Sequence, residues 1–149
     1  MDKVRVLIVE DEAIVSMDLR YKLEAMGYSV PAEIRSGEEA VDAASRLRPD
    51  VILMDIWLSG EMDGIDAAGE IRRRFNIPVV YLTSHADEYT LARAKTTEPS
   101  GYILKPFYDA ELRAVVEMAI DSTRRKSHGE APRASKRRMN PTTPDQLLS

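Results

Sequence analysis

The sequence of 149 residues contains no cysteine. This absence excludes a disulfide framework and any metal site built on thiolates. The sequence also lacks an apolar run near the roughly 20 residues that a membrane-spanning helix needs, so we expect no membrane segment. Residues 1–3 lead directly into an apolar strand, without the charged and apolar regions of a signal peptide. We therefore expect a cytoplasmic protein.

The net charge of −4 is the sum of two parts with opposite sign. Residues 1–121 carry 14 Lys and Arg against 23 Asp and Glu, a net of −9, whereas residues 122–149 carry 7 against 2, a net of +5. The second part includes two basic clusters and few apolar residues, so it cannot bury enough surface to fold. We expect one folded domain at residues 1–122, followed by a basic, disordered tail at residues 123–149.

Apolar runs alternate with helical patterns along the folded part. The runs expected to form strands cover residues 4–9, 29–34, 51–57, 79–82 and 102–104. Each is followed by apolar residues at helical spacing; Gly27 closes the first such helix, and Ser36 with Glu39 forms a capping box that opens the second. Five β-then-α units in strict alternation predict an α/β, doubly wound parallel sheet with helices on both faces, because right-handed crossovers place them there.

Asp55 is the single charged residue within the apolar run 51–57. A short run rich in Val and Ile is typical of a strand buried on both faces, and a charge does not fit into that core. Asp55 is therefore expected at the carboxyl edge of the sheet, where open α/β sheets bind their ligands. By itself, the residue is equally compatible with a carboxylate that caps the following turn.

Polar residues also follow the other strands that are expected to meet at this edge. Glu10 and Asp11 follow the first strand, Thr83 the fourth, and Lys105 the fifth. Carboxylates that lie close together repel one another unless a cation sits between them, and hard oxygen ligands suit Mg²⁺. A lysine at the same edge suits a phosphoryl oxygen. The combination predicts a site that holds a phosphoryl group on Asp55.

These motifs together resemble the receiver domain of two-component response regulators. The resemblance covers about residues 3–122 and rests on Glu10-Asp11, Asp55, Thr83-Ser84 and the run Tyr-Ile-Leu-Lys-Pro-Phe at 102–107. It implies a flavodoxin-like five-stranded parallel sheet of order 2-1-3-4-5. Within the family, it implies a single-domain receiver of the chemotaxis-regulator type.

The resemblance also implies roles in phosphoryl transfer. Asp55 is the phospho-accepting nucleophile, and Thr83 and Lys105 contact the phosphoryl group. The bond between Lys105 and Pro106 is expected to be cis. Thr83 and Tyr102 form a coupled switch, in which the hydroxyl group of Thr83 moves to the phosphoryl group and Tyr102 moves into the space that is vacated.

For the metal, the resemblance implies Mg²⁺ as the cofactor. Asp11 and Asp55 bind it directly, Glu10 binds it through water, and Trp57 binds it through its carbonyl group. The chain departs from the common family pattern in two places. Glu10 stands where Asp is more usual, and the loop after Asp55 is one residue longer, with Ser59 where a proline is typical.

We therefore expect a response regulator that takes a phosphoryl group from a sensor histidine kinase or a histidine phosphotransfer protein and signals through a changed surface. It is expected to catalyse its own Mg²⁺-dependent phosphorylation and dephosphorylation, without acting as an enzyme on other substrates. No glycine-rich ATP loop is present, which argues against a kinase. The alternatives are a phosphorelay intermediate or phosphate sink without its own effector, and an interaction module that works without phosphorylation.

The sequence identifies neither the effector protein nor the oligomeric state, and a homodimer is one option. We expect no membrane partner. Nucleic acid is expected to bind at most weakly, through the basic clusters at residues 124–126 and 136–138 of the tail.

Overall fold

A five-stranded parallel sheet forms the centre of the computed structural model, which describes residues 3–84 and 87–127, except for the side chains of 123–127. The strand order is β2-β1-β3-β4-β5, as predicted. The strands are β1 (Val6–Val9), β2 (Glu33–Ile34), β3 (Val51–Asp55), β4 (Val79–Thr83) and β5 (Gly101–Leu104). Each residue of β1, β3 and β4 is buried, which is why these strands are apolar up to Asp55 and Thr83, the last residues of β3 and β4.

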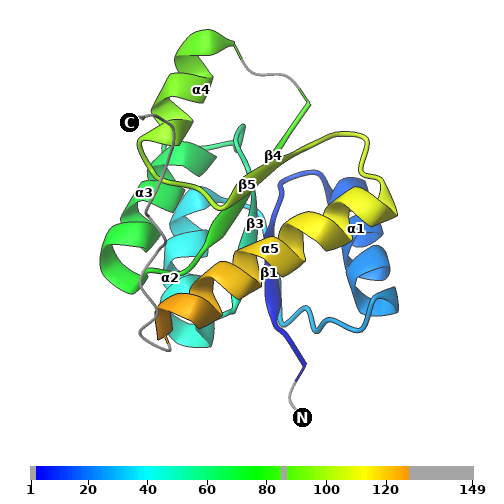
Figure 1. Cartoon of the computed structure of the whole chain (residues 1–149). Helices are drawn as coiled ribbons and strands as arrows, with labels where there is room; N and C mark the ends of the chain where they lie inside the picture. The colour runs from blue at the N-terminus through cyan, green and yellow to red at the C-terminus, as the bar shows by residue number, and fades with distance from the viewer. Residues whose placement is uncertain (1–2, 85–86, 128–149) are drawn as a thin grey trace, which may run out of the picture.

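Among the described residues, four helices connect the strands and a fifth follows β5, and together they cover both faces of the sheet (Figure 1). They are α1 (Ala13–Ala25), α2 (Gly37–Leu47), α3 (Gly64–Phe75), α4 (Glu88–Lys95) and α5 (Asp109–Ser127). α1 and α5 pack against one face, and α2, α3 and α4 lie on the other. Across residues 3–84 and 87–127, no helix combines the length and the apolar composition needed to span a bilayer.

Successive residues of the central strands belong to alternate core clusters. Ile52 and Met54 pack with α2 and α3, whereas Val51 and Leu53 pack with α1 and α5. Side chains of a strand point to opposite faces in turn, so a strand between two helical layers must be apolar on both sides. The first polar residue of such a strand therefore marks the edge of the sheet.

The extents of β2 and α5 differ from the sequence-based expectation. Strand β2 has only two residues instead of the six expected, and Ser29 makes an isolated bridge to Arg5 before the chain reaches it. Pro31 lies in the interval and has no amide hydrogen to donate to a neighbouring strand. At the other end of the domain, α5 continues to Ser127, past the boundary that we expected at residue 122. Residues 128–149, including the cluster 136–138, lie outside the described residues.

The cap of α2 differs in part from the predicted capping box. The hydroxyl group of Ser36 accepts a hydrogen bond from the amide of Glu39, as expected, but it also donates to the carboxylate of Glu39. A complete, reciprocal box instead opens α3, where Asp63 and Asp66 each accept a hydrogen bond from the other's backbone amide. The sequence pattern Asp-x-x-Asp was the signal for it.

Candidate functional site

The predicted site residues meet at the carboxyl edge of the sheet. In the parallel register Val9 lies beside Met54, Asp55 beside Leu82, and Thr83 beside Leu104. The next residues along β1 and β5 are Glu10-Asp11 and Lys105, so these strand ends present their polar groups together. The predicted convergence is confirmed, since parallel strands all point their carboxyl ends in one direction.

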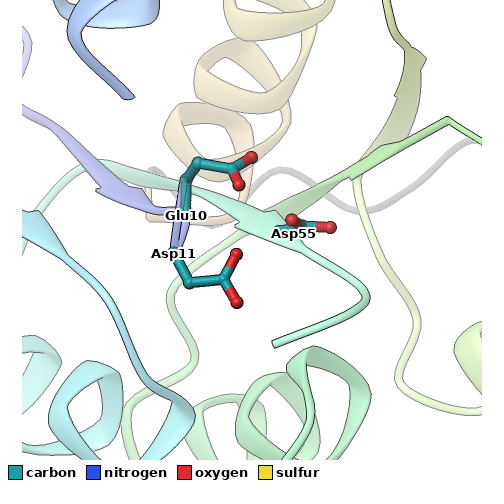
Figure 2. Close-up of side chains that lie close together, drawn as sticks. All are labelled: Glu10, Asp11 and Asp55. Atoms are coloured by element: carbon teal, nitrogen blue, oxygen red, sulfur yellow. The ribbon is translucent and has the colours of Figure 1, made fainter. Parts of the chain in front are cut away.

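Three carboxylates form a compact acidic cluster. Glu10, Asp11 and Asp55 each offer one oxygen atom, and these atoms lie within 4.8 Å of one another. Figure 2 shows Glu10 and Asp11 projecting from the end of β1 toward the side on which Asp55 lies. Glu10 and Asp55 are buried, with 1% and 5% of their surface exposed, whereas Asp11 is half-buried. The open side of the cluster is therefore the side of Asp11.

Lys105 lies between the two buried carboxylates. Its ammonium nitrogen is 3.4 Å from Oδ2 of Asp55 and 3.1 Å from Oε1 of Glu10. The peptide bond between Lys105 and Pro106 is cis, as expected. One ammonium group therefore offsets part of the negative charge of three carboxylates, and a net charge of about −2 remains when all of them are ionised.

The buried position of Asp55 changes its protonation. Burial raises its pKa most strongly, the negative charge of Glu10 raises it further, and Lys105 lowers it, with a resulting pKa of about 7. Burial lowers the pKa of Lys105, but its contact with Glu10 and the charge of Asp55 outweigh this effect and raise it above the ordinary value. Asp55 is thus a carboxylate whose ionised form needs additional positive charge.

Backbone amides also orient the carboxylates. The amide of Trp57 donates to Oδ1 of Asp55 at 3.1 Å, and that of Glu12 donates to Oε2 of Glu10 at 3.2 Å. Asp11 is held by Ser59, whose amide and hydroxyl groups both donate to its Oδ2. The roles predicted for Asp11, Glu10 and the carbonyl group of Trp57 in metal binding stay predictions.

Thr83 and Tyr102, the two residues of the predicted switch, lie on the neighbouring strands β4 and β5. Among the described residues, neither the hydroxyl oxygen of Thr83 nor that of Tyr102 has a hydrogen-bond partner, although both atoms are buried. The ring of Tyr102 lies against that of Tyr81, with 5.9 Å between the centroids. Buried hydroxyl groups without partners are uncommon and are often found at functional sites.

Two features of the site were not anticipated from the sequence. One is the pair of hydrogen bonds from Ser59 to Asp11, which joins residues 48 positions apart. The other is the contact of Arg93 on α4 with Asp63 and Asp66 at the start of α3. The Asp63 cap could have been read from its local pattern, but its partner on α4 could not.

The chain belongs to the response regulator receiver domain family, because the model of that family matches residues 6–117. Among curated proteins, it is similar to the transcriptional regulatory protein PdtaR of Mycobacterium tuberculosis, with 38% identity over 120 residues that cover 80% of this chain and 58% of PdtaR. It is also similar to the phyllosphere-induced regulator PhyR of Methylorubrum extorquens, with 34% identity over 83% of this chain and 47% of PhyR. The chain thus spans about half the length of these relatives.

Solved structures agree with this assignment. The signal receiver domain of a modulated diguanylate cyclase from Desulfovibrio desulfuricans is 41% identical, with a TM-score of 0.81 over 84% of this chain and 99% of that one. The receiver domain of the sensor histidine kinase PA1611 from Pseudomonas aeruginosa is 32% identical, with a TM-score of 0.73 over 80% of this chain and 99% of that one. Its structure has a magnesium ion coordinated in the active site cleft. The predicted family and the flavodoxin-like fold are confirmed.

Proposed function

We propose that the chain accepts a phosphoryl group on Asp55 from the phosphohistidine of a sensor histidine kinase or a histidine phosphotransfer protein. The observation that carries the proposal is the position of Asp55, buried at the end of β3, with Lys105 3.4 Å away and oxygens of Glu10 and Asp11 within 4.8 Å. A carboxylate and a phosphoryl group repel each other, and a lysine together with metal-binding carboxylates is the kind of environment that offsets this repulsion.

In the proposed reaction, an oxygen of Asp55 forms a bond to phosphorus while the bond from phosphorus to the donor's imidazole nitrogen breaks. The electron pair of that bond stays on the imidazole. Lys105 and Thr83 donate to the oxygens of the transferred group, which suits the buried, unpartnered hydroxyl group of Thr83. The chain thereby catalyses its own phosphorylation, and water later attacks the acyl phosphate and releases inorganic phosphate.

Mg²⁺ is the proposed cofactor. The acidic cluster offers hard oxygen ligands, and its residual charge of about −2 beside Lys105 matches a divalent cation. Asp11 and Asp55 would bind the ion directly, Glu10 through water, and Trp57 through its carbonyl group. When bound, the ion neutralises charge on the transferring oxygens. The role of the chain is to hold the carboxylate oxygens of the acidic cluster in place at the ends of β1 and β3.

The proposed output is a change of surface that begins at Thr83 and Tyr102. A phosphoryl group on Asp55 would attract the hydroxyl group of Thr83, and Tyr102, which also lacks a partner for its hydroxyl group among the described residues, would move into the space. The surface that changes would be that of α4, β5 and the start of α5. It would be read by an effector or by a second copy of the chain in the cytoplasm. The part beyond the folded domain is proposed to be a basic tail.

The test is phosphorylation by a small phosphodonor such as acetyl phosphate in the presence of Mg²⁺, followed by intact-mass spectrometry. We expect one added phosphoryl group, which is lost in Asp55→Asn and when a chelator removes the metal. Asp42→Asn is the matched control, because Asp42 is an exposed carboxylate on α2 that does not belong to the acidic cluster. Labelling of Asp55→Asn at the wild-type level would refute the proposal.

The same phosphorylated protein separates the alternatives. An unphosphorylated histidine phosphotransfer protein is added, and the labelled phosphoryl group is followed. Its return to histidine indicates a relay intermediate. A partner that is retained equally by the wild type and by Asp55→Asn indicates an interaction module that works without phosphorylation.

A further inference from the structure

Ser59 makes two hydrogen bonds to one oxygen of Asp11. Its backbone amide donates to Oδ2 at 3.2 Å, and its hydroxyl group donates to the same atom at 2.9 Å. Ser59 belongs to the loop between β3 and α3, whereas Asp11 follows β1. The loop that leaves the phospho-accepting residue therefore holds the side chain of a second member of the acidic cluster.

Asp11 needs such a contact more than the other two carboxylates do. Lys105 lies within 3.4 Å of both Glu10 and Asp55, and no ion pair to Asp11 occurs within the part of the chain that the structure describes. Asp11 is also the least buried of the three. Repulsion from its two neighbours would turn its carboxylate toward solvent, because like charges at this distance disfavour each other. The two donors of Ser59 oppose that rotation.

The hydrogen bonds orient Asp11 without neutralising it. Both donors are uncharged, so the carboxylate keeps its full negative charge for a cation. Because a carboxylate is planar, fixing Oδ2 also fixes the direction in which Oδ1 points. A residue that does not bind the metal itself but orients a metal-binding carboxylate by hydrogen bonding typically contributes a factor of about 10 to 100 in metal affinity. Proline at this position would have neither the amide hydrogen nor the hydroxyl group.

We propose that Ser59 is a positioning residue for metal binding: it holds Asp11 through Oδ2 and leaves Oδ1 available to a cation that the three carboxylates would hold. This inference rests on the proposed function of the acidic cluster as a Mg²⁺ site. It assigns to the loop after Asp55 a task in assembling that site before the metal arrives. This task depends on Ser59, which stands at a position where proline is common in the family.

The test compares Mg²⁺ affinity in three variants. Ser59→Ala removes the hydroxyl donor, Ser59→Pro removes both donors, and Ser59→Thr keeps both. We expect the dissociation constant for Mg²⁺ to rise several-fold in Ser59→Ala and by about 10-fold or more in Ser59→Pro, and to stay near the wild-type value in Ser59→Thr. Ser45→Ala, an exposed serine on α2, is the control.

Binding is followed by the fluorescence of Trp57, the one tryptophan of the sequence, and independently by the shift of the melting temperature with Mg²⁺. Trp57 is a suitable reporter because its amide donates to Asp55 and its side chain is half-exposed. Both measurements need no phosphodonor. Ser59→Ala, which keeps the backbone of the loop unrestricted, remains informative if Ser59→Pro fails to fold.

The outcomes separate this inference from the proposed function. If the wild type binds Mg²⁺ and Asp11→Asn does not, but Ser59→Ala and Ser59→Pro bind as the wild type does, the role of Ser59 is refuted and the metal site stands. A higher affinity in Ser59→Ala would also refute it, because Ser59 would then compete with the cation for Asp11. If the wild type neither binds Mg²⁺ nor accepts a phosphoryl group, the proposed function itself fails.

Discussion

The guanidinium group of Arg93 on α4 lies 3.0 Å from the carboxylate of Asp63, the residue that caps the N-terminus of α3. The second arm of the same group lies 3.1 Å from Asp66, the other member of the capping box. Burial raises the pKa of Asp63, but the amide of Asp66 and the contacts with Arg93 outweigh this effect and hold the pKa below its ordinary value. Helix α4 is thereby joined to the end of the loop that follows Asp55.

We expect Arg93→Ala to lower the free energy of unfolding by about 1–2 kcal/mol, because two hydrogen-bonded carboxylates at a helix N-terminus lose one partner. Arg46→Ala is the matched control: Arg46 pairs with Asp42 on the exposed face of α2, and such a pair contributes at most about 0.5 kcal/mol. Urea denaturation measures both. Equal losses in the two variants would show that the contact of Arg93 is an ordinary surface ion pair.

The raised pKa of Asp55 predicts how stability changes with pH in the absence of metal. Its value of about 7 in the folded protein lies above the ordinary value of 3.8, so the folded state holds the proton more tightly than the unfolded state does. The resulting stability is fully present below about pH 4 and is lost as the pH rises to about 7. Asp55→Asn has no such proton. As the pH rises across this window, we expect its free energy of unfolding to increase relative to that of the wild type by up to about 1.4 kcal/mol per pH unit.

The measurement is urea denaturation of the wild type and Asp55→Asn at pH 5 and pH 8 with a chelator present. Asp42→Asn, which removes an exposed carboxylate and keeps Asp55, should show the same pH dependence as the wild type. Added Mg²⁺ should stabilise the wild type more than Asp55→Asn, since the cation binds the ionised carboxylate. A free energy of unfolding that is higher for the wild type than for Asp55→Asn at pH 8 without metal would contradict the assigned pKa.

Gly64 and Gly69 on α3 give a pair of opposite predictions. A Cβ atom at Gly64 would lie 1.9 Å from the backbone oxygen of Asp55, whereas at Gly69 the nearest atom would be 3.6 Å away. We expect Gly64→Ala to cost more than about 2 kcal/mol and to displace Asp55. Gly69→Ala should stabilise the helix by about 0.5–1 kcal/mol. Thermal and urea denaturation compare them, and a well-tolerated Gly64→Ala would argue against the close approach.

The buried, unpartnered hydroxyl group of Thr83 predicts a separation of phosphorylation from response. We expect Thr83→Ala to accept a phosphoryl group, at a reduced rate, but to lose most of the phosphorylation-induced change in amide hydrogen exchange across residues 87–112. Exchange is compared with and without a phosphoryl mimic such as beryllofluoride, with Ser45→Ala as the control. An undiminished exchange difference in Thr83→Ala would exclude this residue as the start of the response.

Residues 128–149 should be dispensable for the receiver fold. Their composition is poor in apolar residues, and they follow the last residue of α5. We expect deletion of 128–149 to leave the melting temperature and the phosphorylation of Asp55 unchanged. If the basic clusters bind nucleic acid, the deletion, which removes the cluster 136–138 and keeps 124–126, should also weaken an affinity that falls steeply with salt. A markedly lower melting temperature would place part of this segment in the folded unit.

Local patterns in the sequence were sufficient for the elements and for the line of site residues. The apolar run 51–57 predicted a doubly buried strand, and a charged residue in such a run can lie only at its end, where Asp55 is found. Glu10, Thr83 and Lys105 follow from the same rule on their own strands. These inferences hold because successive side chains of a strand point to opposite faces of the sheet. A strand that is buried on both faces is therefore a continuous apolar run, which the sequence displays directly.

Contacts between distant residues were decided only by the tertiary structure. The sequence does not indicate that Ser59 donates twice to Asp11, that Arg93 joins α4 to the cap of α3, or that Lys105 contacts Glu10 as well as Asp55. Each of these pairs joins side chains from separate segments, and their meeting depends on how the helices and loops pack around the sheet. The residue types at the site are thus a property of the sequence, whereas their orientation and protonation arise from packing, because burial and neighbouring charges exist only in the folded chain.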